Sequence, residues 1–262
     1  MGDAESVRDV LGDAWWQGML RQSDDLTRAA EARCPGAVAR LDALLRAWAI
    51  GFAAVRADVL SPDLGEFRRG LGPDEAAGFL AALDARVLHT DSAGFVVPQG
   101  FRRKASGGRY ALFSRSGAGV ALNLEYLIQL AAAAELISFH HIAGTDICFE
   151  KGEFDAVVET DGAPVIAMEA KARIHGPDSL LGLLASLLRL NLDEREAVKP
   201  NHRRKYTALK DITAPGPVTL LLVAEGARWA FDATTTDGGL HLAPRHAAHS
   251  GEQDPALLGL VP

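Results

Sequence analysis

A nearly continuous apolar run in the last quarter of the chain, Val218–Ala224, is the feature that most restricts the fold. Such a run is typical of a strand that is buried on both faces. A second strand-like run, Val165–Ala170, comes before it, and the leucine-rich segment Ser179–Leu192 separates the two. Strand, long crossover and strand together predict a parallel pair in a mixed sheet that helices cover. We therefore expect an α/β fold.

Further segments extend this pattern on both sides. Strand-like residues at Asp146–Phe149 and Phe154–Glu159 precede the first run, and Trp229–Thr234 follows the last. Val120–Ile137 is apolar nearly all round, which predicts a buried helix, and a further helix is expected at about His202–Lys210. These elements predict a mixed central sheet flanked by helices.

The N-terminal part has a helical pattern, with Trp15 and Met19 on one stripe. A helix over about 74–88 followed by a strand at Gly94–Pro98 resembles a winged-helix module. Acids such as Asp74 and Glu75 would repel phosphate from that helix, so a helical packing or oligomerisation module is the better interpretation. We divide the chain into a mainly helical module at 1–95, an α/β domain at 96–240 and a loosely ordered tail at 241–262.

The formal net charge of −7 argues against contact with nucleic acid, but two basic segments contain no acid. They could be solvated faces, or they could contact a phosphate backbone if both flank one site. Their candidate contact residues are Arg102, Arg103 and Lys104 in the first segment and Asn201, His202, Arg203 and Lys205 in the second.

Location and cysteine chemistry are also constrained by the sequence. The acidic N-terminus lacks the apolar core of a secretory signal, and the apolar stretch Leu41–Leu60 carries four charges, as amphipathic helices do. Cys34 and Cys148 lie far apart without the spacing of a zinc site or a disulfide framework. We expect a cytoplasmic protein that does not span a membrane.

Two acids and a lysine, Asp155, Glu169 and Lys171, flank a turn between two of the expected strands. Successive side chains of a strand alternate in direction, so Glu169 and Lys171 share one face. Asp155 joins that face if the positions of paired residues sum to an even number. A tight hairpin at Asp161-Gly162 gives an odd sum, so the site requires an odd-length loop or a bulge, which Pro164 favours.

A fourth group should come from the buried helix that precedes these strands. Glu125 and Gln129 lie one turn apart on a common face, while Glu135 is rotated away. A carboxylate in so apolar a helix needs a partner such as a metal, a metal-bound water or Lys171. We prefer Glu125 to Glu135; the alternative is an exposed acid or a cap at the helix end.

The order of these parts resembles the PD-(D/E)xK phosphodiesterase superfamily, which has the restriction-endonuclease-like fold. The resemblance rests on a helix with Glu125, a strand with Asp155, a strand with Glu169-Ala170-Lys171, and then a helix and a strand. It covers about 120 residues, and Phe154 stands where the family often has proline. It implies that Asp155, Glu169, the Ala170 carbonyl and Glu125 hold Mg²⁺ or Mn²⁺ and that Lys171 orients a water or acts as a base.

The resemblance also implies an activity and a partner. It predicts a metal-dependent nuclease, a phosphodiesterase acting on DNA in preference to RNA, in DNA processing or defence. Two alternatives stay open: a catalytically silent nucleic-acid-binding or scaffold protein, and a helical adaptor in which Glu169 and Lys171 are a structural pair. A homodimer or a partner subunit also remains open.

Overall fold

A seven-stranded mixed sheet forms the centre of the protein in a computed structural model that describes residues 3–56, 71–103, 108–116, 119–138, 140–236 and 239–245. The strands lie in the order β12-β11-β10-β9-β8-β7-β3. Strands β9 and β10 are parallel, as the crossover predicts, and β3 is parallel to β7, whereas the other neighbours are antiparallel. The bounds of these strands are β3 Arg102–Arg103, β7 Ile147–Lys151, β8 Phe154–Thr160, β9 Ala163–Ala170, β10 Val218–Ala224, β11 Ala227–Thr236 and β12 Gly239–Pro244.

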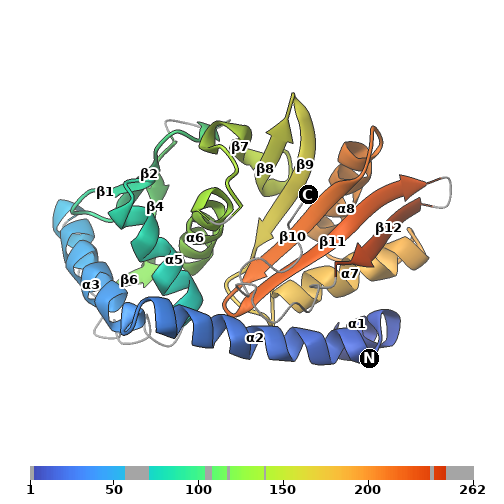
Figure 1. Ribbon diagram of the computed structural model, residues 1–262, viewed down its shortest axis with the longest axis horizontal. Coiled ribbons are helices and arrows are strands. Elements are labelled where there is room, and N and C mark those ends of the chain that lie inside the picture. The colour runs from blue at the N-terminus through green and yellow to red at the C-terminus, as the bar shows by residue number, and fades with distance from the viewer. Residues whose placement is uncertain are drawn as a thin grey trace.

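Helices cover both faces of this sheet (Figure 1). On one face, Met168 and Val223 pack into a core with α6; on the other, Ala167 and Leu222 pack with α7 and α8. This alternation along β9 and β10 explains why both strands read as continuous apolar runs. The described helices are α1 Asp3–Leu11, α2 Asp13–Arg33, α3 Ala37–Arg56, α5 Pro73–Asp84, α6 Leu124–Ser138, α7 Leu180–Leu192 and α8 Pro200–Thr213.

Five short strands lie outside the main sheet. They are β1 Leu88–Thr90, β2 Phe95–Pro98 and β4 Tyr110–Ala111, which form one small sheet, and β5 Phe113–Ser116 and β6 Gly119–Leu122, which form a hairpin. The helix expected over Val120–Ile137 is wrong at its start, because Val120 pairs with Arg115 in that hairpin and α6 begins at Leu124. An apolar run alone does not separate a short strand from the first turn of a helix.

The N-terminal helices do not form a separate module. Helix α2 runs along the protein from the α3 end to the sheet (Figure 1), and Trp15 contacts Trp229 and Phe231 of β11. Val7 of α1 belongs to the same core as α7. The expected domain boundary near residue 95 therefore does not separate two cores. The expected tail also begins too early, because β12 continues to Pro244; residues 246–262 lie outside the described part.

Helix α5 is the helix that a winged-helix module would use to read DNA. It packs among α2, α3 and α6, and Phe79 and Leu80 at its centre are buried. A helix enclosed in this way cannot enter a DNA groove. The buried position of α5 agrees with the preference for a packing role of the N-terminal helices over a winged-helix module.

A buried ion network joins α5, α6 and β11. The Arg228 guanidinium of β11, 5% exposed, donates to both carboxylate oxygens of Glu135 at 2.9 Å and lies 3.5 Å from Asp74 and from Glu75. Burial, followed by the neighbouring Asp74 charge, raises the pKa of the Glu75 carboxyl well above its usual range. Among the described helices, none is both long and apolar enough to cross a membrane.

Candidate metal centre

The β8–β9 hairpin has the register that the site requires. Asp161 and Gly162 form its turn with positive φ angles of 52° and 81°, which suit a two-residue hairpin turn. Next to the turn, Thr160 pairs with Ala163, which gives the odd sum of a tight hairpin. A register shift at Val158/Glu159 then changes the sum to even.

Beyond this bulge, Ala156 pairs with Met168. Asp155 consequently lies opposite Glu169, on the face that Glu169 shares with Lys171. The requirement derived from the sequence is confirmed, and a bulge fulfils it in place of a longer loop.

Three carboxylates converge at the end of β9. Glu125 in the first turn of α6, Asp155 on β8 and Glu169 on β9 each place an oxygen within 4.8 Å of the oxygens of the other two. Glu125 is thus the acid that α6 contributes, as preferred, while Glu135 binds Arg228. Carboxylate oxygens at such spacing are suited to a hard divalent cation such as Mg²⁺ or Mn²⁺.

Lys171 joins two of these carboxylates. Its backbone N–H donates to the Val223 carbonyl at 2.9 Å, which holds the residue beside β10. Its Nζ donates to Glu125 Oε1 at 2.8 Å, to Glu169 Oε1 at 2.6 Å and to the Ala170 carbonyl at 2.9 Å. The Ala170 oxygen, named as a metal ligand by the resemblance, accepts from the lysine here.

A second lysine, Lys205 of α8, binds the other oxygen of Glu169. Its Nζ donates to Glu169 Oε2 at 2.6 Å and also to the carbonyl of Glu153. Glu169 is 1% exposed, so each of its oxygens depends on one lysine for a partner. Two lysine charges among three carboxylates leave one negative charge uncompensated when all five groups are ionised.

Burial and a neighbouring charge both disfavour the ionised form of Asp155. Burial, followed by repulsion from the Glu169 carboxylate, raises the pKa of Asp155 to about 8. The Ala170 backbone N–H, which donates to Asp155 Oδ2 at 2.6 Å, offsets part of this effect. At neutral pH Asp155 is therefore mainly protonated, and a cation that binds there must displace a proton.

The amine of Lys171 is charged under the same conditions. Burial on its own lowers the pKa of Lys171, but the Glu169 and Glu125 carboxylates outweigh it, so the pKa stands above its usual range. A lysine in this state donates hydrogen bonds and cannot take up a proton. A base role for Lys171 would require a pKa lowered by desolvation, and this condition is not met in the metal-free protein, whereas an orienting role agrees with its contacts.

Three further side chains at the site were not assigned to it from the sequence. Gln129, fully buried on α6, donates from Nε2 to the Asp155 carbonyl at 2.8 Å and to Glu150 Oε1 at 3.2 Å. Its position one turn after Glu125 was the signal that could have identified it. Lys205 was expected to contact phosphate, and for Glu150 the sequence carries no signal.

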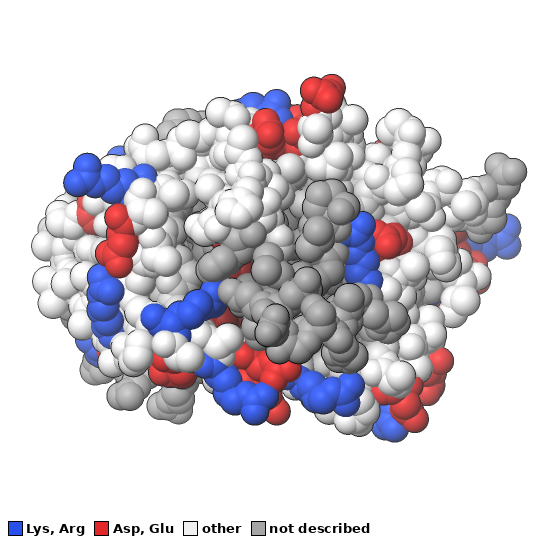
Figure 2. Space-filling view, viewed as in Figure 1, with Lys and Arg blue, Asp and Glu red and all other residues white. Residues whose placement is uncertain are grey.

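In the first basic segment, Arg102 contacts protein groups outside the three-carboxylate site. Arg102 donates to Glu159 Oε2 at 2.8 Å and to the Asp146 carbonyl at 3.3 Å. The side chain of Arg103 and the whole of Lys104 lie outside the described residues. Among the described residues on the face that Figure 2 shows, Lys and Arg are interspersed with Asp and Glu and form no continuous basic surface.

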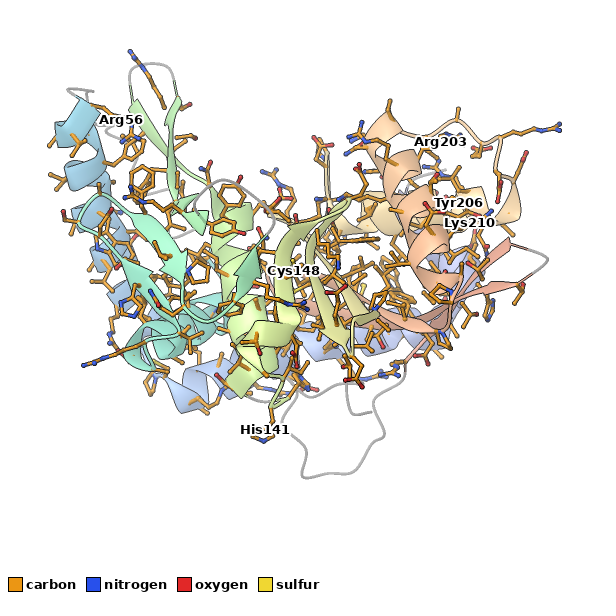
Figure 3. All side chains as sticks on the ribbon, turned by 90° about the horizontal axis from the view of Figure 1, so that it is seen from above. Arg56, His141, Cys148, Arg203, Tyr206 and Lys210 are labelled. Atoms are coloured by element: carbon orange, nitrogen blue, oxygen red, sulfur yellow. The ribbon has the colours of Figure 1, made fainter. Side chains whose placement is uncertain are left out.

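The second basic segment begins α8 and is largely occupied within the chain. Arg203 donates to the carbonyls of Glu194 and Glu196 at 2.6 and 2.5 Å, and it lies on the same helix as Tyr206 and Lys210 (Figure 3). His202 is 2% exposed and contacts Ser186, while Asn201 is half-buried. These contacts fix the connection between α7 and α8.

Comparison with known proteins gave partial matches to curated aminotransferases. The chain is 28% identical over 146 residues to histidinol-phosphate aminotransferases of Neisseria meningitidis serogroups C and A, which is 51% of this chain and 38% of each relative. The serogroup B protein is 29% identical over 140 residues, 49% of this chain and 36% of the relative. The chain thus spans less than two fifths of the length of these relatives. No family model matches the chain, and no solved structure matches it.

These relatives correct the activity expected from the sequence. They are named as aminotransferases, a different enzyme class from phosphodiesterases. The expectation of a metal-dependent nuclease is therefore wrong by this comparison, and with it the alternative of a silent nucleic-acid-binding form of such an enzyme. Fold and chemistry diverge often enough that a short acidic motif does not determine activity.

Proposed function

We propose that this protein binds a divalent cation, Mg²⁺ or Mn²⁺, through Glu125, Asp155 and Glu169. The observation that carries the proposal is the convergence of three carboxylate oxygens within 4.8 Å from three separate elements, α6, β8 and β9. Such convergence is costly for like charges in a partly buried place. A cation that bridges the oxygens would remove this cost.

The neighbouring side chains support the same interpretation. Lys171 and Lys205 hold Glu169 from its two oxygens, and the Ala170 N–H holds Asp155, so the acids are fixed by the protein itself. The Gln129 Oε1 atom is buried without a hydrogen-bond partner among the described residues. Ligands fixed in this way by their neighbours lose less entropy when a cation binds.

The chemistry of a cation at this place follows from general principles. A bound Mg²⁺ or Mn²⁺ polarises an oxygen ligand and lowers the pKa of a bound water. Lys171 would orient a group next to the cation by donating a hydrogen bond, and Asp155 would release its proton as it becomes a ligand. We propose cation binding and assign no substrate.

We further propose that the α/β part has the restriction-endonuclease-like arrangement. Its support is the order of α6, β7, β8, β9, α7 and β10, with the acid on β8 opposite the acid of the Glu169-Ala170-Lys171 unit on β9. This arrangement concerns the fold alone, because one fold carries many activities.

An aminotransferase function, as in the relatives' name, does not fit the described side chains. Pyridoxal phosphate enzymes hold their cofactor on a lysine amine as a Schiff base. The lysines that the structure describes are each engaged with a carboxylate: Lys151, Lys171, Lys199, Lys205 and Lys210. The raised pKa of Lys171 is the reverse of what Schiff-base formation requires.

Calorimetric titration with Mn²⁺ at pH 8 tests the cation proposal. We expect one site per chain and a loss of affinity of at least about tenfold in Glu169→Gln and in Asp155→Asn. Glu153→Gln is the matched control, since Glu153 precedes β8 and its side chain binds Arg204 at the surface. Unchanged affinity in Glu169→Gln, or no binding by the native protein, would refute the proposal.

A further inference from the structure

A cavity of 760 Å³ lies between α1, the β9–α7 loop, α7 and the start of α8, and none of the three carboxylates lines it. Its wall includes Ser186 and Arg189 of α7 and His202 of α8. Its volume falls within the range of about 300–1,000 Å³ that small-molecule sites occupy. Of the three residues named here, the sequence analysis assigned a role only to His202, as a candidate contact to nucleic acid.

A polar stripe on α7 forms one side of the cavity. Gly182, Ser186 and Arg189 follow one another at spacings of four and three residues, which places them on one face of the helix. The remaining positions of α7 are mostly leucines buried in the core. These three positions interrupt the leucine-rich surface of α7 on the side that lines the cavity.

His202 presents a hydrogen-bond acceptor in this wall. The Ser186 hydroxyl donates to the Gly182 carbonyl at 2.8 Å, so its oxygen accepts the proton of His202 Nδ1, also at 2.8 Å. His202 Nε2 is then a lone-pair acceptor, and it has no partner among the described residues. Burial, followed by the Lys199 charge, lowers the pKa of His202 to about 4, so the ring is neutral near pH 7.

Arg189 presents a charged donor close by. Its Nε is buried and has no hydrogen-bond partner in the described part of the chain, and its Nη2 lies 3.9 Å from Asp3 Oδ1, beyond hydrogen-bond distance. Buried polar atoms are nearly always satisfied in folded proteins. Arg189 and His202 both line the cavity, and each carries a buried polar atom without a hydrogen-bond partner in the described part of the chain, which indicates groups that a ligand could complete.

We propose that this cavity binds a small organic anion that carries a hydroxyl or amine donor near its charged group. The anionic oxygens would accept from Arg189, and the donor would bind His202 Nε2. The ring cannot donate from Nε2, so an anion without such a donor leaves His202 unsatisfied. None of Glu125, Asp155 and Glu169 lines this cavity.

Nuclear magnetic resonance of protein with ¹⁵N-labelled histidine tests the proposal. Gluconate is the probe, because it combines a carboxylate with hydroxyl groups; hexanoate lacks the hydroxyls, and sorbitol lacks the charge. Metal is first removed with EDTA, and the EDTA is then removed by dialysis, so that neither a metal at the three carboxylates nor the chelator contributes. We expect gluconate to shift the His202 Nε2 resonance saturably and to bind more tightly than hexanoate or sorbitol.

Variants of Arg189 and Arg204 show whether gluconate binds through Arg189 or through the overall charge of the protein. Arg189→Met should weaken gluconate binding by about tenfold or more, because a charge-assisted hydrogen bond is lost. Arg189→Lys keeps the positive charge, so a folding defect caused by loss of that charge is avoided. Because lysine lacks the guanidinium donors, this variant should still bind gluconate more weakly than native protein does. Arg204→Met, at an exposed position of α8, should bind as native protein does. No shift of His202 with gluconate, or equal binding by Arg189→Met, would overturn the proposal.

Discussion

The Lys171→Met variant distinguishes two roles of the lysine. In one, Lys171 compensates the carboxylates of a cation site; in the other, Lys171 and Glu169 form an ion pair with a structural role alone. In the native protein, Lys171 Nζ binds Glu125, Glu169 and the Ala170 carbonyl within 2.9 Å. Methionine has a similar length but donates no hydrogen bond. The variant therefore leaves Glu169 Oε1 buried without its donor.

The size of the effect follows from these contacts. Removing one member of a buried ion pair costs about 3–5 kcal/mol. Lys205 still binds Glu169 Oε2 in the variant, so we expect the lower end, about 3 kcal/mol, in metal-free protein. For a chain of this size, that loss lowers Tm by about 6–12 °C.

A divalent cation should reverse much of this loss. With one lysine charge against three carboxylates, the variant should gain more stability from Mn²⁺ than native protein does, because stabilisation by a ligand depends on its affinity for the folded state. Thermal unfolding of native protein, Lys171→Met and Lys199→Met, each in EDTA and in Mn²⁺, measures both effects. Lys199 pairs with Asp178 at the surface, so its replacement should change stability by about 0.5 kcal/mol or less.

The outcome distinguishes the two interpretations of the lysine. If Lys171→Met is as stable as native protein or more stable in EDTA, Glu169 and Lys171 are a structural pair of the kind that an apolar residue replaces without loss. The same conclusion follows if Mn²⁺ stabilises both proteins equally.

Three further outcomes follow from the buried charges. The pKa of Asp155 is raised to about 8 in the folded protein, so the folded state holds a proton there that the unfolded chain loses near pH 4. The free energy of unfolding of metal-free protein should therefore be highest below about pH 4 and fall by up to about 1.4 kcal/mol per pH unit towards pH 8. Urea unfolding at several pH values measures this slope, which should be smaller in Asp155→Asn. Mn²⁺ binding at pH 7 should release close to one proton, which calorimetry in buffers of different ionisation enthalpy measures. Arg228→Met should cost about 3–5 kcal/mol in urea unfolding, because Glu135 and its neighbours lose their buried cation; a loss under about 1 kcal/mol would contradict the importance of that network.

Strands β7 to β11 and the parallel pair could be predicted from the sequence, and β9 and β10 most readily, because both are buried on both faces and their apolar runs leave little ambiguity. Strands β3 and β12 were not predicted. The β5–β6 hairpin could not be predicted, since Val120–Leu122 joins directly onto the apolar start of α6 and a run of this kind has no period that separates strand from helix.

In the candidate site, too, some features could be predicted from the sequence and others could not. The face shared by Glu169 and Lys171, and the even register that brings in Asp155, follow from strand geometry. That a bulge at Val158/Glu159 provides this register depends on pairing across the hairpin. Lys205 was beyond local reasoning, because α8 lies more than thirty residues after Glu169 and meets it through the packing of α8 on the sheet.

Anomalous diffraction from crystals soaked in Mn²⁺ tests the cation site most directly. We expect one strong anomalous peak within coordination distance of oxygens from Glu125, Asp155 and Glu169, and its loss in Glu169→Gln crystals treated in the same way. A native crystal with no peak between these three carboxylates at saturating Mn²⁺, or a peak that persists in Glu169→Gln, would contradict the account.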